Sequence, residues 1–152
     1  MNFQTPLVLL SGCVGFGEEY TRVVGFSNRQ VGAVVLKGTT LAPRLGNPAH
    51  RIYETPMGML NAIGLQNPGV ATVVDDILPG LDFEETRFIA NVSGSTIDEY
   101  VEVTRRFDDS PIDAIEINIS CPNVKEGGVA FGNDPDMSAR VVEACRKATA
   151  KP

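Results

Sequence analysis

The chain has 152 residues, 43% of them hydrophobic, which fits one domain without an internal boundary and with a sizeable core. Its 19 acidic and 13 basic side chains give a net charge of −6, which offers no electrostatic reason for nucleic acid or an anionic membrane as a partner. No apolar run approaches the length of a membrane-spanning helix, and the start lacks the basic flank of a signal peptide, so we predict a soluble, cytoplasmic protein. Three widely spaced cysteines and a single histidine predict neither a disulfide framework nor a metal site.

The first part of the chain predicts two β-strands with a glycine-rich turn between them. The apolar runs Pro6–Leu10 and Ala33–Leu36 are typical of short strands, and a weak helical pattern covers Gly17–Phe26. The glycines of Gly12–Gly17 (GCVGFG) do not have the spacing of a dinucleotide-binding GxGxxG motif. This turn also contains Cys13, to which the pattern gives no role.

A long segment without a sustained period follows the second strand. Gly38–Gln66 contains prolines at 43, 48 and 56, and connections of this length in compact domains are usually functional or disordered. Its arginines, methionines and Tyr53 make it too apolar and aromatic for a plain disordered linker. We therefore predict an ordered active-site loop.

A helix, a strand and a second helix are predicted next. Asn67–Leu81 carries valine, isoleucine and leucine residues at one-face helical spacing, and Phe88–Val92 is typical of a strand. Thr96 followed by Glu99 has the form of a capping box. This motif predicts a helix that begins after Thr96, and an apolar stripe continues it to Phe107.

The following predicted strand, Ala114–Ile119, has one apolar and one polar face. Successive strand side chains point to opposite faces, so Glu116, Asn118 and Ser120 share the polar face. An antiparallel strand with this face in water would explain the pattern. However, helical segments before and after the strand favour βαβ units and a parallel sheet, in which both faces are usually covered. A covered polar row needs hydrogen-bond partners, and a ligand can supply them.

The last predicted element is a helix near the end of the chain. Asp134 followed by Pro135 fits an N-cap with proline at the first helical position. We expect one side of this helix to be apolar and to place Cys145 in the core. The residues on that side are Val141, Val142, Cys145 and Ala148.

Four sequence blocks closely resemble the class 1 dihydroorotate dehydrogenases. They are SGCVGFGEEY at 11–20, KGTTLAPRLGNPAHRIYETPMGMLNAIGLQNPGV at 37–70, NVSG at 91–94 and IEINISCPNVKEGGVAFG at 115–132. The resemblance implies an α/β fold, namely a partial TIM (β/α)8 barrel with about its first four β/α units and with ligands at the carboxyl ends of the strands. It also implies FMN as cofactor and the oxidation of dihydroorotate to orotate in pyrimidine biosynthesis.

The resemblance further implies roles for individual residues. Cys121 would be the general base that removes a proton from C5, while a hydride leaves C6 for the flavin, and Lys37 would offer positive charge between flavin and substrate. The implied substrate-binding residues are Lys37, Asn61, Ala62, Ile63, Gly64, Leu65, Asn118 and Asn123, and the implied FMN-binding residues are Ser11, Gly12, Lys37, Gly38, Asn91 and Asn118. Without the resemblance, Cys121 would be interpreted as a structural thiol, Lys37 as a solvated lysine and the asparagines as turn residues.

The chain also departs from the family pattern. Leu10 replaces a residue that is commonly small, and Glu116 has no role that we derive beyond a polar structural contact. The chain begins late and stops where the fifth strand would follow, so about half of the barrel is expected. The continuation CPNVKEGG is more similar to the NAD-linked subtype, a homodimeric catalytic subunit that works with an iron-sulfur and FAD electron-transfer subunit.

Two alternatives stay open at this point. The pyrimidine-reducing domain of dihydropyrimidine dehydrogenase shares the barrel and a related Asn-Ser-Cys-Pro motif, although KGTTLAPRLGNP favours dihydroorotate. The other alternative is a catalytically inactive half-barrel that self-associates through exposed strand edges. Flavin absorbance of the purified chain would distinguish an enzyme from such a fragment.

Overall fold

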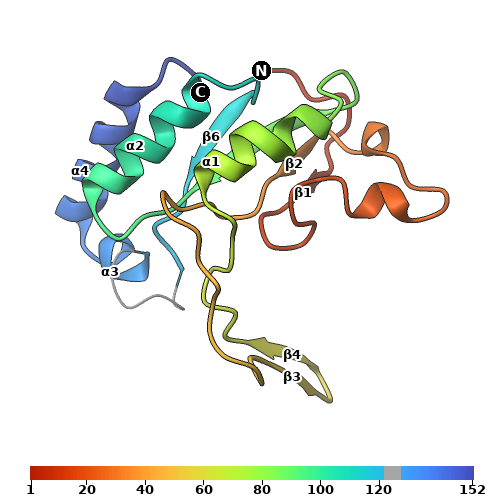
Figure 1. The fold of residues 1–152 in the computed structure, drawn as a ribbon, viewed down its shortest axis with the longest axis horizontal. Helices are drawn as coiled ribbons and strands as arrows, with labels where there is room; N and C mark the ends of the chain where they lie inside the picture. The colour runs from red at the N-terminus through yellow and green to blue at the C-terminus, as the bar shows by residue number, and fades with distance from the viewer. Residues whose placement is uncertain (122–127) are drawn as a thin grey trace.

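The computed structural model describes residues 1–121 and 128–152 and shows a parallel four-stranded sheet (Figure 1). The strands lie in the order β1-β2-β5-β6, and each pair of neighbours is parallel. Their bounds are β1 Val8–Leu9, β2 Ala33–Val35, β5 Arg87–Val92 and β6 Ala114–Ile117. All four predicted strands are confirmed, and β1 is shorter than expected because a turn already begins at Leu10, whose carbonyl accepts the Cys13 N–H at 3.1 Å.

α-Helices connect β2 to β5 and β5 to β6, as expected for a partial α/β barrel. The bounds are α1 Val70–Thr72, α2 Ile97–Asp108, α3 Val129–Gly132 and α4 Pro135–Ala148. The helix predicted over Asn67–Leu81 is present as α1, which continues through a π-helical turn at Val73–Ile77 and a 3-10 turn at Leu78–Gly80. It begins later than predicted because Gly69, with φ 85°, is its N-cap. The short α3 had no sequence signal that we recognised.

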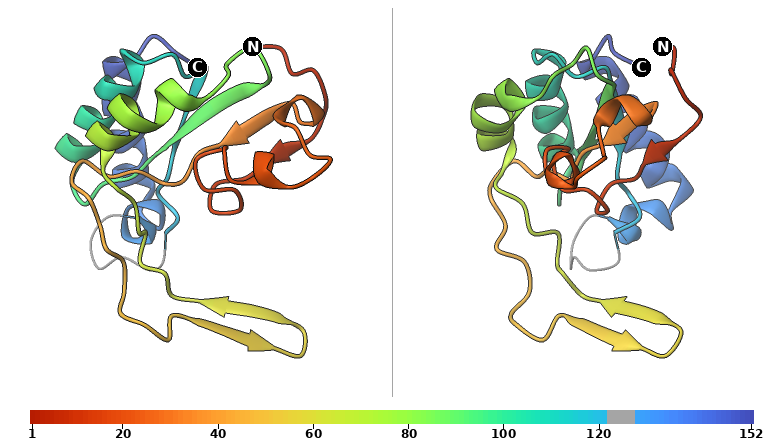
Figure 2. Two further views of the ribbon diagram at one scale, coloured as in Figure 1. Left: turned by 45° about the vertical axis from the view of Figure 1, so that its right-hand side comes forward. Right: turned by 90° about the vertical axis from the view of Figure 1, so that its right-hand side faces the viewer.

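The core lies between the sheet and these helices. The apolar face of the strands packs against α1, α2 and α4. Figure 2 shows these helices beside the sheet. The largest completely buried side chains include Phe88, Tyr100 and Phe107. Cys145 is also buried, as predicted, whereas Val142 is 46% exposed. Placing Val142 on the apolar side was wrong, because it lies one helical step of about 100° from Val141.

The predicted helix caps are present in α2 and α4. The Thr96 hydroxyl accepts the Glu99 N–H at 3.2 Å, and the Asp134 carboxylate accepts the N–H groups of Asp136 and Met137 at 2.9 and 3.2 Å. In the capping box, the Glu99 carboxylate accepts from Ser95 at 2.6 Å, one residue before the expected Thr96 N–H. Both helices therefore begin at the predicted residues with their first amides satisfied.

The weak helical pattern over Gly17–Phe26 does not form the predicted helix. Only a 3-10 turn at Tyr20–Arg22 is present. Gly17 and Gly25, at the two ends of the pattern, have φ values of 94° and 87°, which an α-helix does not accommodate. This correction leaves an irregular segment after β1.

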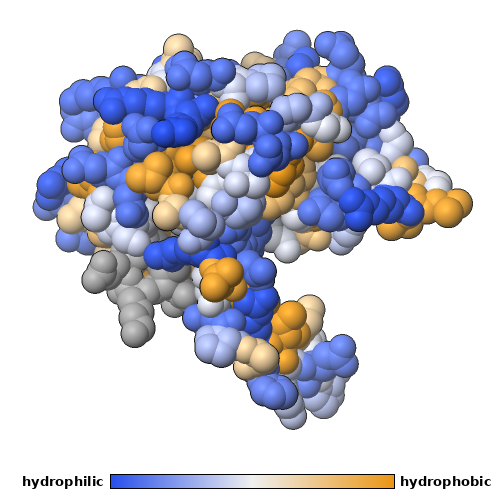
Figure 3. All heavy atoms as spheres, viewed as in Figure 1, coloured by the Kyte–Doolittle hydropathy of each residue, from blue (hydrophilic) through white to orange (hydrophobic). Residues whose placement is uncertain are grey.

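The segment Gly38–Gln66 is ordered, as predicted, but it is not without secondary structure. β3 (Ile52–Thr55) and β4 (Gly58–Asn61) form an antiparallel hairpin that projects from the rest of the chain (Figures 1 and 2). Its side chains are largely exposed on both faces, and Figure 3 shows apolar and polar residues mixed on it. Alternation of apolar and polar residues is expected where one face of a strand pair is buried. The hairpin has no buried face, so its sequence lacks this alternation and the pattern did not predict it.

In the part of the chain that the structure describes, no helix has the length and apolar character needed to cross a membrane.

Candidate active site

Polar and glycine residues collect where the parallel strands end. Ser11 and Gly12 follow β1, Lys37 follows β2, Asn91 lies near the end of β5 and Asn118 follows β6. Because the strands are parallel and adjacent, their carboxyl ends meet at one edge of the sheet. In barrels of this type, that edge carries the active site.

An irregularity in the sheet determines the position of Lys37. Val35 pairs with Ile89, and Thr39 pairs with Val92. The segment that follows β2 therefore advances four residues while β5 advances three. The extra residue lies at or next to Lys37. The Lys37 N–H donates to the Gly15 carbonyl at 2.7 Å and not to a residue of a neighbouring strand. Such a bulge turns side chains away from the regular alternation and is common beside active sites.

The polar face of β6 forms a continuous hydrogen-bonded row with β5. Asn91 and Glu116 are register partners, and the Asn91 side-chain amide donates to the Glu116 carboxylate. The Asn118 side-chain amide donates to Asn91 Oδ1 at 3.1 Å. Asn118 Oδ1 in turn accepts from the Ser120 N–H at 3.3 Å and from its hydroxyl at 3.4 Å. The predicted polar row therefore finds its main partner in Asn91 of the neighbouring strand, although Glu116 and Ser120 are exposed and not covered as expected.

The backbone of Asn118 is held from two sides. Its N–H donates to the Val92 carbonyl at 2.8 Å, and its carbonyl accepts the Tyr100 hydroxyl from α2 at 2.6 Å. Burial raises the pKa of Tyr100, so the hydroxyl keeps its proton and remains a donor. Helix α2 therefore fixes the chain just before Cys121.

The predicted substrate loop, Asn61–Leu65, is bent back against the segment before the hairpin. Asn47 donates its side-chain amide to the Ala62 carbonyl at 2.8 Å and its N–H to the Ile63 carbonyl at 2.9 Å. Gly64 and Leu65 have φ values of 76° and 56°. A left-handed leucine is uncommon and is maintained only where the surroundings impose it. Here Leu65 is buried beside Gly38.

Two adjoining cavities of about 460 and 540 Å³ lie at this edge. Ser11, Gly12, Lys37, Leu65 and Cys121 line both. The first is also lined by Cys13, Ile52, Met59, Asn61 and Ile63, and the second by Leu10, Gly38, Asn91, Glu116, Ile117, Asn118 and Ser120. The volumes are in the range of about 300–1,000 Å³ that is usual for small-molecule sites.

Most of the predicted site residues are thus brought together. Ala62 and Gly64 belong to the bent loop but do not line either cavity, and Asn123 lies outside the described residues. Cys13 was not predicted to belong to the site. Its signal was its place in the turn of Ser11 and Gly12, directly after the first strand.

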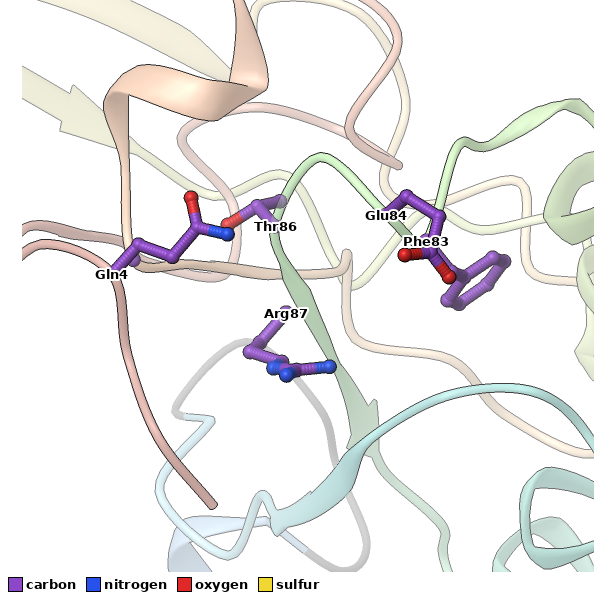
Figure 4. Close-up of a pocket in the computed structure, with 6 residues that line it drawn as sticks. Gln4, Phe83, Glu84, Thr86 and Arg87 are labelled. Carbon is purple, nitrogen blue, oxygen red and sulfur yellow. The ribbon is translucent and has the colours of Figure 1, made fainter.

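A much smaller cavity lies at the opposite edge of the sheet. It has a volume of about 90 Å³ and is lined by Gln4, Gly32, Phe83, Glu84, Thr86 and Arg87 (Figure 4). Arg87 is the first residue of β5, and its guanidinium pairs with the Asp113 carboxylate at 3.0 Å. This hollow is too small for a typical ligand, and the amino-terminal face of such barrels serves stability.

Comparison with known proteins identifies the family of the chain. The family model described as dihydroorotate dehydrogenase matches residues 1–152. The chain belongs to the dihydroorotate dehydrogenase family. This membership confirms the resemblance carried by the four sequence blocks.

Two bacterial dihydroorotate dehydrogenases illustrate the similarity. The protein of Oceanobacillus iheyensis is 49% identical over 153 residues, covering 100% of this chain and 50% of its own length. That of Geobacillus kaustophilus is 48% identical over 153 residues, covering 100% of this chain and 48% of its own length. Both are named dihydroorotate dehydrogenase B (NAD(+)), catalytic subunit. The chain spans about half the length of these curated relatives.

A solved dihydroorotate dehydrogenase structure has the same fold. It is the enzyme of Eimeria tenella in complex with ferulenol, with a TM-score of 0.75 and 22% sequence identity. The match covers 97% of this chain and 42% of that chain. The expected partial barrel is therefore confirmed.

Proposed function

We propose that the protein oxidises dihydroorotate to orotate, with FMN as the hydride acceptor. The observation that carries this proposal is that Lys37 and Cys121 line one cavity with Asn61, Ile63 and Leu65. A cation suits the substrate carboxylate, a thiol suits removal of a proton, and a loop with backbone amides suits the ring carbonyls. They come from three separate stretches of the sequence, so a shared cavity is not a consequence of proximity along the chain.

The residues around Gly38 fit a flat cofactor. A Cβ added at Gly38 would lie 2.8 Å from both Asn91 Oδ1 and Leu65 Cδ1, so only glycine leaves the backbone open there. The nearby Ser93 hydroxyl is buried and has no hydrogen-bond partner among the described residues. Ser11, Gly12, Lys37, Gly38, Asn91 and Asn118 would hold FMN, which accepts the hydride from C6 of the substrate when bound.

Cys121 is the proposed general base. Its thiolate takes the proton from C5, the electron pair of that C–H bond forms the C5–C6 double bond, and the C6 hydrogen leaves with its own pair as hydride. Cys121 is half-buried and follows the fixed Asn118 backbone, so its sulfur is held at the cavity wall. The Val129 N–H donates to the Cys121 carbonyl at 3.1 Å and holds the chain from the other side.

Lys37 and the bent loop are proposed to orient the substrate. The Lys37 ammonium offers charge to the substrate carboxylate, and such charge-assisted bonds are the stronger ones. Asn61 and the backbone amides of Ile63 and Leu65 would bind the pyrimidine ring, together with Asn118. Ala62 and Gly64 would shape the loop, and the Ala62 N–H donates to the Arg51 carbonyl at 2.8 Å. The same role for Asn123 is a prediction from the resemblance alone.

We also propose the partners that the relatives' names suggest. The words "catalytic subunit" in those names support a separate electron-transfer subunit as a partner. The cytoplasmic location, the homodimer and the iron-sulfur and FAD groups of that subunit are proposed from the family resemblance alone.

Anaerobic reduction tests the proposal. The full-length protein, purified with its flavin, should lose its flavin absorbance when dihydroorotate is added, with one orotate formed for each flavin reduced. Dihydrouracil is the control substrate, since it lacks the carboxylate that Lys37 would bind. Bleaching by dihydrouracil but not by dihydroorotate would contradict the proposal and favour the dihydropyrimidine dehydrogenase type of barrel.

A further inference from the structure

Glu116 lies at one end of a hydrogen-bond network to which the proposed function gives no role. This network extends from the Glu116 carboxylate through the side-chain amides of Asn91 and Asn118 to Ser120. All four residues line the same cavity of about 540 Å³. Glu116 itself is exposed to this cavity, whereas Asn91 is only 2% exposed.

The chemistry of the two ends fixes the direction of every bond between them. An ionised carboxylate only accepts hydrogen bonds, so Asn91 must turn its NH₂ group toward Glu116. A backbone N–H only donates, so Asn118 must turn its Oδ1 toward Ser120. The central bond, from Asn118 Nδ2 to Asn91 Oδ1 at 3.1 Å, is the one arrangement compatible with both ends.

This direction determines what the asparagines offer to a ligand. Both side-chain oxygens are occupied within the chain of bonds, by Asn118 and by Ser120. Each amide nitrogen carries two hydrogens and donates one of them within the described residues, which leaves one N–H on Asn91 and one on Asn118. The pair therefore presents donors, which suit the carbonyl and carboxylate oxygens of a ligand.

We propose that Glu116 is a positioning residue that fixes the amide direction of Asn91 and Asn118 so that both present N–H donors to the bound ligand. The inference rests on the proposed function for the identity of that ligand. Glu116 acts only through Asn91, the one side chain with which it shares a hydrogen bond among the described residues. Without an acceptor at position 116, either amide can turn over and present an oxygen that repels a ligand oxygen.

The test compares two substitutions of Glu116 in the full-length protein. Glu116→Leu removes the acceptor, and Glu116→Gln keeps one while removing the charge. Orotate affinity is measured by titrating the flavin absorbance, and FMN affinity by the fluorescence of released flavin. Glu102→Leu is the matched control, because Glu102 is partly exposed on α2 and its one ion pair among the described residues is with Arg106 at 3.2 Å.

We expect Glu116→Leu to weaken orotate binding by about tenfold or more, since one hydrogen bond to a charged ligand is disturbed. Glu116→Gln should stay within about threefold of the unsubstituted protein, because its Oε1 accepts from Asn91. A tenfold loss in the glutamine variant would assign the effect to charge and overturn the proposal, even if the leucine variant did not retain flavin.

A double-mutant cycle with Asn91→Ala excludes a general structural role. If Glu116 acts through Asn91, adding Glu116→Leu to Asn91→Ala should change neither affinity further, whereas additive losses would overturn the proposal. A protein that binds FMN but not orotate would contradict the proposed substrate. The coupling between Glu116 and Asn91 would then still be decided by the FMN affinities.

Discussion

Lys37 illustrates how the surrounding backbone determines the position of one residue. The one-residue bulge after β2 directs its N–H to Gly15 and leaves its side chain in the wall of both cavities. The sequence identified this lysine through the KGTT motif, but nothing in the pattern indicated the bulge. The change of register depends on pairing with β5, some fifty residues later, and local sequence does not encode such pairing.

The first prediction concerns the charge of Lys37. Lys37→Ala should weaken orotate binding about tenfold to a hundredfold, because a charge-assisted hydrogen bond contributes roughly 1.5–3 kcal/mol. Lys147→Ala is the control, since Lys147 is an exposed helical residue paired with Glu143 at 2.6 Å. The measurement is orotate titration of the flavin-bound protein, and overlapping curves for the two variants would count against the role of Lys37.

At the scale of elements, local signals located the helices better than the hairpin. The capping residues of α2 and α4 act through hydrogen bonds within three residues, so the sequence indicates them directly. The β3–β4 hairpin has no buried face and therefore no alternating pattern. The loop Asn61–Leu65 is assigned to substrate binding by family resemblance alone, and its left-handed Leu65 depends on packing against residues that are distant in sequence.

The second prediction concerns the N-cap of α2. Thr96→Ala should lower the free energy of unfolding by about 1 kcal/mol, because the Glu99 N–H loses its acceptor. Thr96→Ser should restore most of the loss, since serine supplies the same hydroxyl. Thermal unfolding of the three proteins measures the difference, and equal melting temperatures for the alanine variant and the unsubstituted protein would argue against the cap.

At the scale of the whole molecule, one buried core ties the sheet to its helices. Val34, Phe88 and Ala90 from the sheet belong to the same cluster as Tyr100 of α2 and Cys145 of α4. The composition and the strand and helix order were sufficient to predict this parallel α/β arrangement. They were not sufficient to show which residues face one another across the site, because that depends on register and bulges.

The third prediction is a pH dependence that originates in this core. Burial raises the pKa of the Cys145 thiol above its ordinary value of 9.0. Below pH 9.0 the Cys145 thiol is protonated in the folded and in the unfolded state, so its burial contributes fully to the free energy of unfolding. Above pH 9.0 the thiol ionises in the unfolded state before it does so in the folded state. The stability contributed by its burial is therefore lost as the pH rises toward the folded-state pKa.

Cys145→Ala should therefore be most destabilising near neutral pH, by about 1–2 kcal/mol for the lost packing, and less so at about pH 10. Chemical denaturation at both pH values measures the two differences. Cys13→Ala is the control, because Cys13 is exposed. A destabilisation by Cys145→Ala that is the same at both pH values would refute the assignment.

The central claim is that Cys121 is the base of a dihydroorotate dehydrogenase site, and single-turnover flavin reduction tests it most directly. The full-length Cys121→Ser protein, mixed anaerobically with dihydroorotate near neutral pH, should retain its flavin but reduce it about 10²–10⁴-fold more slowly than the unsubstituted protein. The physical reason is that a thiol ionises far more readily than an alcohol, so the serine variant supplies almost none of the ionised form that accepts the C5 proton. Flavin reduction by the serine variant at the rate of the unsubstituted protein would contradict the account.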